Sequence, residues 1–276
     1  SNLLFTLQYG SGHSPEWLFE QHRLWHEKHA APLASEIKAH SNEQKLEKRL
    51  RVGYLSPDFR GHSCAYFLEP LFRAHDKTQV EIFCYAEVQN ADPVTARFRQ
   101  LSDHWYDTIG KSDQEVAEQI RNDGIDILVD LAGHTANNRL SVFARKPAPI
   151  QISWLGYPDT TGMNTIDYRL SDFVADPEGM SDKYFTETLM RLPNGFLCYS
   201  PLFQTPEVSE LPFLKSGKIT FGSFNNLTKV NEEVIAAWSR ILLVCCLKAD
   251  SLLMNPPGSD TTAYSRITTL RPSVSQ

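Results

Sequence analysis

From residue 50 onward, short β-branched and aromatic runs alternate with amphipathic stretches, the pattern of a parallel sheet flanked by helices. The runs predict strands at residues 51–56, 80–86, 125–131, 150–155 and 168–171. Between them, the periodicity predicts helices at 66–74, 94–100 and 112–122. We therefore predict an α/β domain over residues 46–210.

Two further regions flank this domain. Ser14 and Pro15 are a typical cap and first residue of a helix, which we predict to run to residue 30 within an N-terminal helical linker segment, residues 1–45. Its apolar residues, expected to pack on the next domain, are Trp17, Leu18, Leu24 and Trp25. A strand at 218–224 and a helix at 232–243 predict the start of a second domain, residues 216–276, ending in an irregular tail rich in Ser and Thr.

Composition narrows the possible partners. The net charge is -6 and 41% of the residues are hydrophobic, so we expect a soluble protein without the basic field that binds nucleic acid or an anionic membrane. There is no apolar run long enough to span a membrane and no basic leader, which favours the cytoplasm. The five cysteines have no C-x-x-C spacing, so we expect reduced, buried thiols without a metal or redox role.

Ligands of open α/β sheets bind outside the carboxyl ends of the strands, so the loops after the strands hold the candidate chemistry. After the first strand, Asp58 and His62 are spaced so that one turn brings them together as a general base and its orienting partner. The alternative is that Asp58 caps a helix and His62 is a solvated loop residue.

Three other segments carry weaker signals. His134 follows the strand at 125–131, where it would contact a sugar or peptide, or merely adjoin a helix cap. Gly156 follows the strand at 150–155 and would let a ligand approach the backbone, with Leu155 as an apolar wall. Asn226 and Lys229 precede a predicted helix start, which suits a diphosphate, although an isolated lysine is more often a surface residue.

In order along the chain, these segments resemble the catalytic region of the O-linked N-acetylglucosamine transferase family, which includes the SPINDLY-type fucosyltransferases. The likeness covers roughly residues 1–243. The matching stretches are RVGYLSPDFRGHS (51–63), DGIDILVDLAGHT (123–135), RKPAPIQISWLGYPDTTG (145–162), DYRLSDFVADP (167–177) and ITFGSFNNLTKV (219–230).

The resemblance implies a GT-B architecture, in which a complete N-terminal Rossmann-like domain faces a second one that here is incomplete. It also implies a tetratricopeptide repeat array upstream. His62 matches the family's active-site histidine, Asp58 an aspartate in proton transfer, and Lys229 the lysine on the nucleotide diphosphate. The implied substrate-binding residues are Ser63, His134, Leu155, Gly156, Pro158 and Asn226.

The implied reaction transfers N-acetylglucosamine from UDP-N-acetylglucosamine to a Ser or Thr hydroxyl of a protein, with inversion. We expect no metal or other cofactor, because Lys229 and helix-end amides would stabilise the leaving diphosphate. The family continues well beyond the Lys229 segment, so this chain is expected to be a truncated, weakly active or inactive form. The alternatives are a non-catalytic acceptor-binding fragment and a SPINDLY-type O-fucosyltransferase that uses GDP-fucose.

Overall fold

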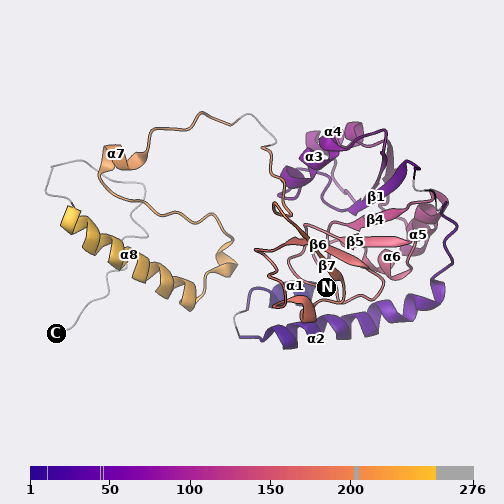
Figure 1. Ribbon diagram of the computed structural model, residues 1–276, viewed down its shortest axis with the longest axis horizontal. Coiled ribbons are helices and arrows are strands. Elements are labelled where there is room, and N and C mark those ends of the chain that lie inside the picture. The colour runs from indigo at the N-terminus through magenta and orange to yellow at the C-terminus, as the bar shows by residue number, and fades with distance from the viewer. Residues whose placement is uncertain (11, 44, 46, 202–204, 253–276) are drawn as a thin grey trace. The chain divides into compact units, whose positions relative to one another are not determined.

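The computed structural model describes residues 1–10, 12–43, 45, 47–201 and 205–252, with side chains up to residue 244. The chain divides into two compact units, Ser1–Thr205 and Pro206–Gln276. The first unit contains the sheet and the N-terminal helices (Figure 1).

The first unit is built on a seven-stranded sheet in which every neighbouring pair is parallel. The strand order is β3-β2-β1-β4-β5-β6-β7. This confirms the predicted α/β class. The strands are β1 (Leu50–Ser56), β2 (Val80–Ala86), β3 (His104–Asp107), β4 (Ile127–Asp130), β5 (Ile150–Ser153), β6 (Tyr168–Asp172) and β7 (Thr188–Leu192).

Helices cover both faces of the sheet, and each face has its own apolar core. Alternate residues of β1 point to opposite faces, so Tyr54 joins the core under α3 (Ala65–Ala74) and α4 (Pro93–Leu101). Leu55 joins the core under α5 (Asp113–Asn122) and α6 (Leu140–Ala144). The predicted capping box of α5 is confirmed, since Ser112 and Glu115 bond each other's backbone N–H groups.

Strands β3 and β7 and helices α1 (Asn2–Leu7) and α6 escaped the sequence prediction. Both strands are short and lie at the two edges of the sheet, and neither contains a buried residue. Without a buried apolar run, such segments give little signal. The predicted strand at 125–131 is shorter at both ends in the structure, and the one at 150–155 ends earlier, because residues 154–155 turn into the loop that leaves the sheet.

The N-terminal helix begins as predicted. In α2 (Pro15–Trp25) the Ser14 hydroxyl accepts from the Trp17 N–H, and the helix continues as a π-helix, His26–Ala30, and a 3-10 helix, Ala31–Glu36. Trp25 packs on the core, but Leu24 and Trp17 are 47% and 41% exposed, so the predicted packing face was partly wrong. The residue that α2 buries is His22, because its ring bonds a tyrosine of the sheet unit.

The second unit contains α7 (Pro212–Ser216), a 3-10 turn Leu227–Lys229 and α8 (Glu232–Leu252). The strand predicted at 218–224 was wrong, since these residues form no regular structure and Phe221 and Phe224 are exposed. A strand needs a neighbour to pair its backbone, and residues 206–252 contain none. The Ser/Thr-rich tail lies outside the described residues. In the described part of the chain, no helix is long and apolar enough to cross a membrane.

Candidate functional site

The strand order predicts a ligand site at the carboxyl edge of the sheet. The chain runs from β1 outward to β2 and β3, then returns to β4 on the other side of β1, so the order reverses between β1 and β4. Loops leaving two parallel strands at such a switch point diverge to opposite faces and leave room for a ligand between them. Three predicted loops, 57–63, 132–139 and 154–162, follow the adjacent strands β1, β4 and β5 and so leave from this edge.

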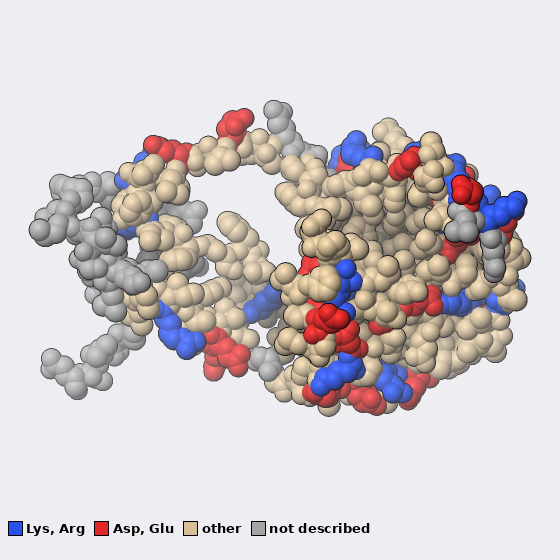
Figure 2. All heavy atoms as spheres, in the orientation of Figure 1, with Lys and Arg blue, Asp and Glu red and all other residues tan. Residues whose placement is uncertain are grey.

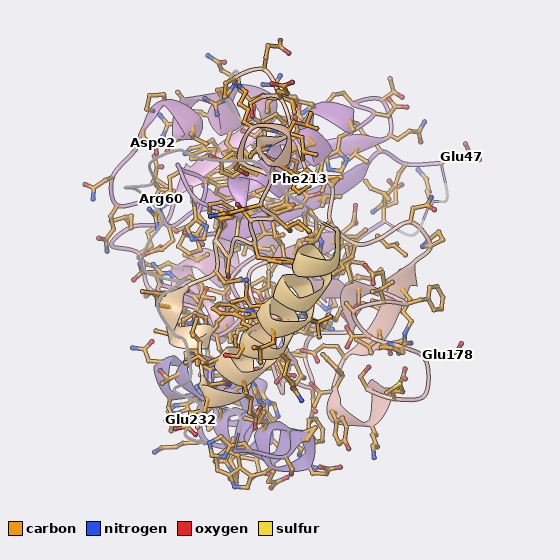
Figure 3. All side chains as sticks on the ribbon, turned by 90° about the vertical axis from the view of Figure 1, so that its left-hand side faces the viewer. Glu47, Arg60, Asp92, Glu178, Phe213 and Glu232 are labelled. Carbon is orange, nitrogen blue, oxygen red and sulfur yellow. The ribbon has the colours of Figure 1, made fainter. Side chains whose placement is uncertain are left out.

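The loop after β1 brings Asp58 and His62 together. Oδ2 of Asp58 lies 3.5 Å from Nδ1 of His62; the Asp58 side chain is 10% exposed and the His62 side chain 35%. The guanidinium of Arg60 is 3.3 Å from the other carboxylate oxygen, and Asp92 anchors the loop by accepting from the Gly61 N–H at 2.6 Å. Arg60 and Asp92 are both labelled at the left of Figure 3. The predicted Asp–His contact is therefore present, with the histidine open to solvent.

Cys64 completes a small cluster with this pair. Its backbone N–H donates to Nδ1 of His62 at 3.3 Å, and within the described part of the chain Nε2 has no hydrogen-bond partner. Burial, followed by the charge of Asp58, raises the pKa of the Cys64 thiol to about 12, so the thiol is protonated. Ser63, between the two, is exposed toward solvent.

The loop after β4 is built inward. Asp130 is buried and accepts from the Ala132 and Gly133 N–H groups, and burial raises the pKa of its carboxyl to about 6. In the same loop, directly after Gly133, His134 is fully buried, with Nε2 2.9 Å from the Thr161 carbonyl and Nδ1 3.2 Å from the Ser1 hydroxyl. Burial lowers the pKa of His134 to about 3, so the ring is neutral. Both ring nitrogens are engaged, and His134 presents no free polar atom to a substrate.

His134 belongs to a buried cluster that ties α2 to the loop after β5. His22 is also fully buried; its Nδ1 lies 2.7 Å from the Leu18 carbonyl and its Nε2 lies 2.8 Å from the Tyr157 hydroxyl. Burial raises the pKa of Tyr157 above its usual range. The rings of His22, His134 and Tyr157 lie 5.3 to 5.8 Å apart, centre to centre. This His22–His134–Tyr157 cluster fixes the position of the loop.

The loop after β5 packs against the loop after β4, backbone to backbone. A Cβ on Gly156 would lie 2.0 Å from the Leu131 carbonyl oxygen, so this glycine permits a close approach to the loop after β4, and the predicted approach of a ligand stays a prediction. Leu155 has a positive φ of 76°, a strained conformation for a branched residue. Arg169 of β6 donates to the Asp159 and Tyr157 carbonyls at 2.9 and 2.8 Å. Pro158 is exposed on this fixed loop, and Leu155 is half-buried.

His22, Arg169 and Asp130 support the site but were not predicted from the sequence. His22 pairs with Tyr157, 135 residues away, while Arg169 and Asp130 accept or donate within their own neighbouring loops. The one available signal was the presence of charged or imidazole groups inside otherwise apolar strand and helix patterns. Burying such groups is costly unless they are hydrogen-bonded, so they mark a built network.

The fourth predicted segment lies in the second unit. The Asn226 side chain accepts from the Thr228 N–H, and Lys229 ends the 3-10 turn three residues before α8 begins at Glu232. Both residues are exposed. The local prediction of a lysine just ahead of a helix start is confirmed.

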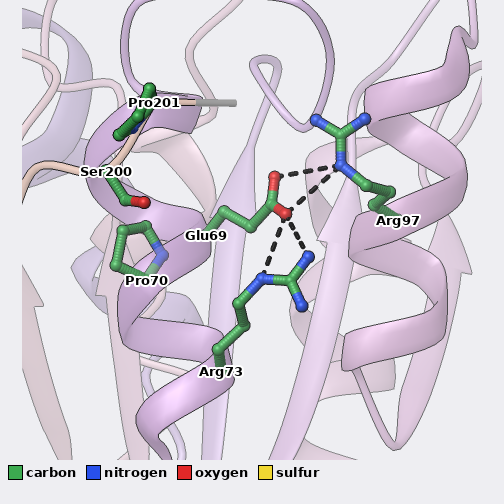
Figure 4. Close-up of a pocket in the computed structure, with 6 residues that line it drawn as sticks. All are labelled: Glu69, Pro70, Arg73, Arg97, Ser200 and Pro201. Atoms are coloured by element: carbon green, nitrogen blue, oxygen red, sulfur yellow. Dashed lines mark hydrogen bonds and ion pairs between the residues drawn. The ribbon is translucent and has the colours of Figure 1, made fainter. Parts of the chain in front are cut away.

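Two pockets on the described surface lie away from these loops. One, of about 150 Å³, lies where the connector at Ser200 crosses α3, and its walls include Glu69, which bonds both Arg73 and Arg97 (Figure 4). The other, of about 270 Å³, lies at the amino ends of β1 and β4, the opposite edge of the sheet. On the face of the first unit seen in Figure 2, acidic and basic side chains are interspersed. Neither hollow includes a predicted site residue.

Three cysteines have described side chains, and all three are free. Cys84 is buried and Cys64 half-buried, but Cys198 is exposed, contrary to prediction, because it lies on the connector with its thiol 3.0 Å from the Phe67 carbonyl oxygen. The predictions for Cys245 and Cys246 lie outside the described side chains.

Comparison with known proteins agrees with this architecture. Residues 23–203 match the profile of Glycosyl transferase family 41. The chain belongs to this family. Among its members, the probable UDP-N-acetylglucosamine--peptide N-acetylglucosaminyltransferase SPINDLY of Petunia hybrida is 40% identical over 94% of this chain and 28% of its own length. The UDP-N-acetylglucosamine--peptide N-acetylglucosaminyltransferase of Caenorhabditis elegans is 38% identical over 54% of this chain and 13% of its own.

The fold comparison extends the same relationship. A mutant of the Thermobaculum terrenum O-GlcNAc transferase superposes with a TM-score of 0.79 at 38% identity, covering 90% of this chain and 46% of that one. The chain thus spans about half of that family 41 enzyme and less than a third of the plant SPINDLY relatives it matches.

Proposed function

We propose that this chain carries the acceptor-side half of the catalytic centre of an inverting protein O-glycosyltransferase that uses UDP-N-acetylglucosamine. The observation that carries the proposal is the Asp58–His62 contact at the switch point between β1 and β4. The relatives from Petunia hybrida and Caenorhabditis elegans, which are named UDP-N-acetylglucosamine--peptide N-acetylglucosaminyltransferases, support the same donor and acceptor.

In the proposed reaction, the hydroxyl oxygen of an acceptor serine or threonine attacks the anomeric carbon of the sugar. The new C–O bond forms as the bond to UDP breaks, the electron pair leaves on the diphosphate, and the configuration inverts. The hydroxyl proton passes to Nε2 of the partly exposed His62 ring, which requires the ring's own hydrogen to be on Nδ1, facing Asp58 at 3.5 Å, in place of the contact with the Cys64 N–H. Once the ring is protonated, the carboxylate at 3.5 Å stabilises the imidazolium.

In this proposal, residues of the second unit stabilise the negative charge on the departing diphosphate. Lys229 is exposed immediately ahead of α8, where helix-end N–H groups also favour an anion. In this proposal the lysine and these amides replace a metal ion, so treatment with EDTA does not lower the transfer rate by more than about twofold. We place the reaction in the cytoplasm, because the free thiols Cys64, Cys84 and Cys198 suit a reducing compartment.

A chimera tests the proposal, because this chain spans less than half of the Thermobaculum enzyme. Residues 1–243 are joined to the carboxy-terminal remainder of that enzyme, and Ser/Thr peptides are analysed by intact mass after incubation with UDP-N-acetylglucosamine or GDP-fucose. We expect one N-acetylhexosamine to be added from the UDP sugar, and Lys229→Ala to lower kcat at least about 100-fold. The unmodified chain, assayed alongside, should bind UDP more weakly than the chimera.

Three outcomes would contradict the proposal. Transfer of deoxyhexose alone, from GDP-fucose, would assign the chain to the fucosyl alternative. Full transfer by the Lys229→Ala chimera would remove this lysine from the reaction. A folded chimera that binds peptide but transfers nothing would leave a non-catalytic acceptor-binding fragment.

A further inference from the structure

Three different metal-binding side chains meet in the loop after β1. The ligand atoms of Asp58, His62 and Cys64 all lie within 4.8 Å of one another. In the residues that the structure describes, no other group of three or more His, Cys, Asp or Glu side chains is placed in this way. Carboxylate, imidazole and thiolate together form a mixed O, N and S set of the kind that binds zinc.

The spacing within the cluster fits a tetrahedral ion. Bonds of about 2.0 to 2.2 Å to zinc place two oxygen or nitrogen ligands about 3.3 to 3.6 Å apart. Oδ2 of Asp58 and Nδ1 of His62 are 3.5 Å apart, already within this range. The Cys64 sulfur lies within 4.8 Å of both other ligand atoms and must move closer to bond the same ion. It can do so because Cys64 is only two residues from His62 on the same loop.

The surroundings of the cluster leave one side open. The His62 side chain is partly exposed, so a water molecule can take the fourth position, as in zinc sites with three protein ligands. Nδ1 of His62 accepts only a long hydrogen bond, 3.3 Å, from the Cys64 N–H, so its lone pair can be given to a metal ion instead. Asp58 is anchored by its own N–H, which donates to the Ser56 hydroxyl at 3.0 Å.

One group competes with a cation. The Arg60 guanidinium lies 3.3 Å from Oδ1 of Asp58 and repels any ion bound at Oδ2. Its side chain is 43% exposed and contacts Asp58 from the solvent side, so it can swing away. Arg60 therefore weakens a metal site here without blocking it.

We propose that Asp58, His62 and Cys64 form an inhibitory zinc site in the loop after β1. On binding, the Cys64 thiol loses its proton to solvent and its sulfur bonds the ion, together with the Asp58 carboxylate and Nδ1 of His62. This differs from the sequence-based expectation that the cysteines bind no metal. The inhibition, though not the binding, rests on the proposed function, because zinc would hold the imidazole that receives the acceptor's proton.

The binding is tested on this chain as it stands, after chelator treatment. Cobalt(II) is titrated and followed by its thiolate charge-transfer absorption, and zinc affinity is then measured by competition with a chromophoric chelator. We expect one zinc per chain at the cluster. Cys64→Ser should remove the charge-transfer band and weaken zinc binding at least about tenfold. The matched control is Cys198→Ser, which removes an exposed thiol outside the cluster and should change neither.

A second variant, Arg60→Gln, leaves all three proposed zinc ligands in place. Loss of the competing guanidinium should tighten zinc binding severalfold while the melting temperature stays the same. The site is overturned if the wild-type chain shows no thiolate band with cobalt, if Cys198→Ser abolishes the band, or if Arg60→Gln weakens binding.

The inhibition is tested on the chimera, and its failure is distinguishable from failure of the site. We expect micromolar zinc to suppress transfer and Cys64→Ser to relieve the suppression. Zinc that binds the cluster without slowing transfer would contradict the role of His62 in the proposed function. Transfer that depends on His62 but resists zinc in a chain that binds none would overturn the zinc site alone.

Discussion

Two histidines follow adjacent strands at the same edge of the sheet, yet their environments differ completely. His62, after β1, is partly exposed, contacts Asp58 at 3.5 Å and, among the residues the structure describes, keeps one ring nitrogen without a hydrogen-bond partner. His134, after β4, is fully buried with both nitrogens bonded. A histidine at a strand end is therefore available for chemistry only where its loop turns outward; where the loop turns inward, the same residue type becomes part of the support.

The largest effect should come from removing the exposed histidine. His62→Ala in the chimera should lower kcat/KM about 10²- to 10⁴-fold, the usual contribution of a general base. The free energy of unfolding should hardly change, because the ring is partly solvated. The control is His104→Ala, which removes another half-exposed histidine next to a carboxylate, Glu81. Equal losses in the two variants would show that the effect at position 62 is not specific to the histidine beside Asp58.

Removing a buried histidine should act on stability instead. His22→Ala leaves a cavity and strips the Tyr157 hydroxyl of its 2.8 Å partner, which should lower the free energy of unfolding by about 2 to 4 kcal/mol. Urea denaturation of the unmodified chain measures this. His13→Ala, an exposed position just before α2, is the control and should change stability by less than about 0.5 kcal/mol. A His22 variant as stable as the control would show that the buried cluster does not hold the fold.

The smallest effect is a pH dependence that separates the two loops. The pKa of His134 is about 3 when folded, against 6.5 ordinarily, so between these values the unfolded chain binds more protons and stability falls as pH falls. At pH 5 the loss is about 2 kcal/mol relative to pH 7.5. The wild type should therefore lose more stability over this interval than His134→Gln does.

Asp130 acts in the opposite direction and must be separated from His134. Its folded pKa of about 6 lies above the ordinary 3.8, so the stability it contributes below pH 4 is lost as pH rises through 6. Asp130→Asn should steepen the acid loss seen in the wild type. Parallel pH profiles of the wild type and His134→Gln would contradict the buried, neutral ring.

The sequence predicted most of the sheet and the open part of the site. Strands β1, β2 and β4 contain buried apolar runs, and Asp58 and His62 are four residues apart, so local spacing was enough to pair them. The buried cluster was invisible because the contacts of His22 join residues more than 100 positions apart, and helical periodicity placed Trp17 and Leu24 inward where His22 belongs. The strand at 218–224 failed for the related reason that pairing depends on a neighbour, which periodicity cannot supply.

The backbone contact between Gly156 and Leu131 bears on how the acceptor specificity of the proposed transferase can be altered. Any larger residue at position 156 would collide with a main-chain carbonyl, and any at 133 with the base of Tyr157, so neither position tolerates variation. Libraries aimed at new acceptors should leave both glycines fixed and diversify the exposed neighbours Ser63 and Pro158, where side chains can change without moving the frame beneath them.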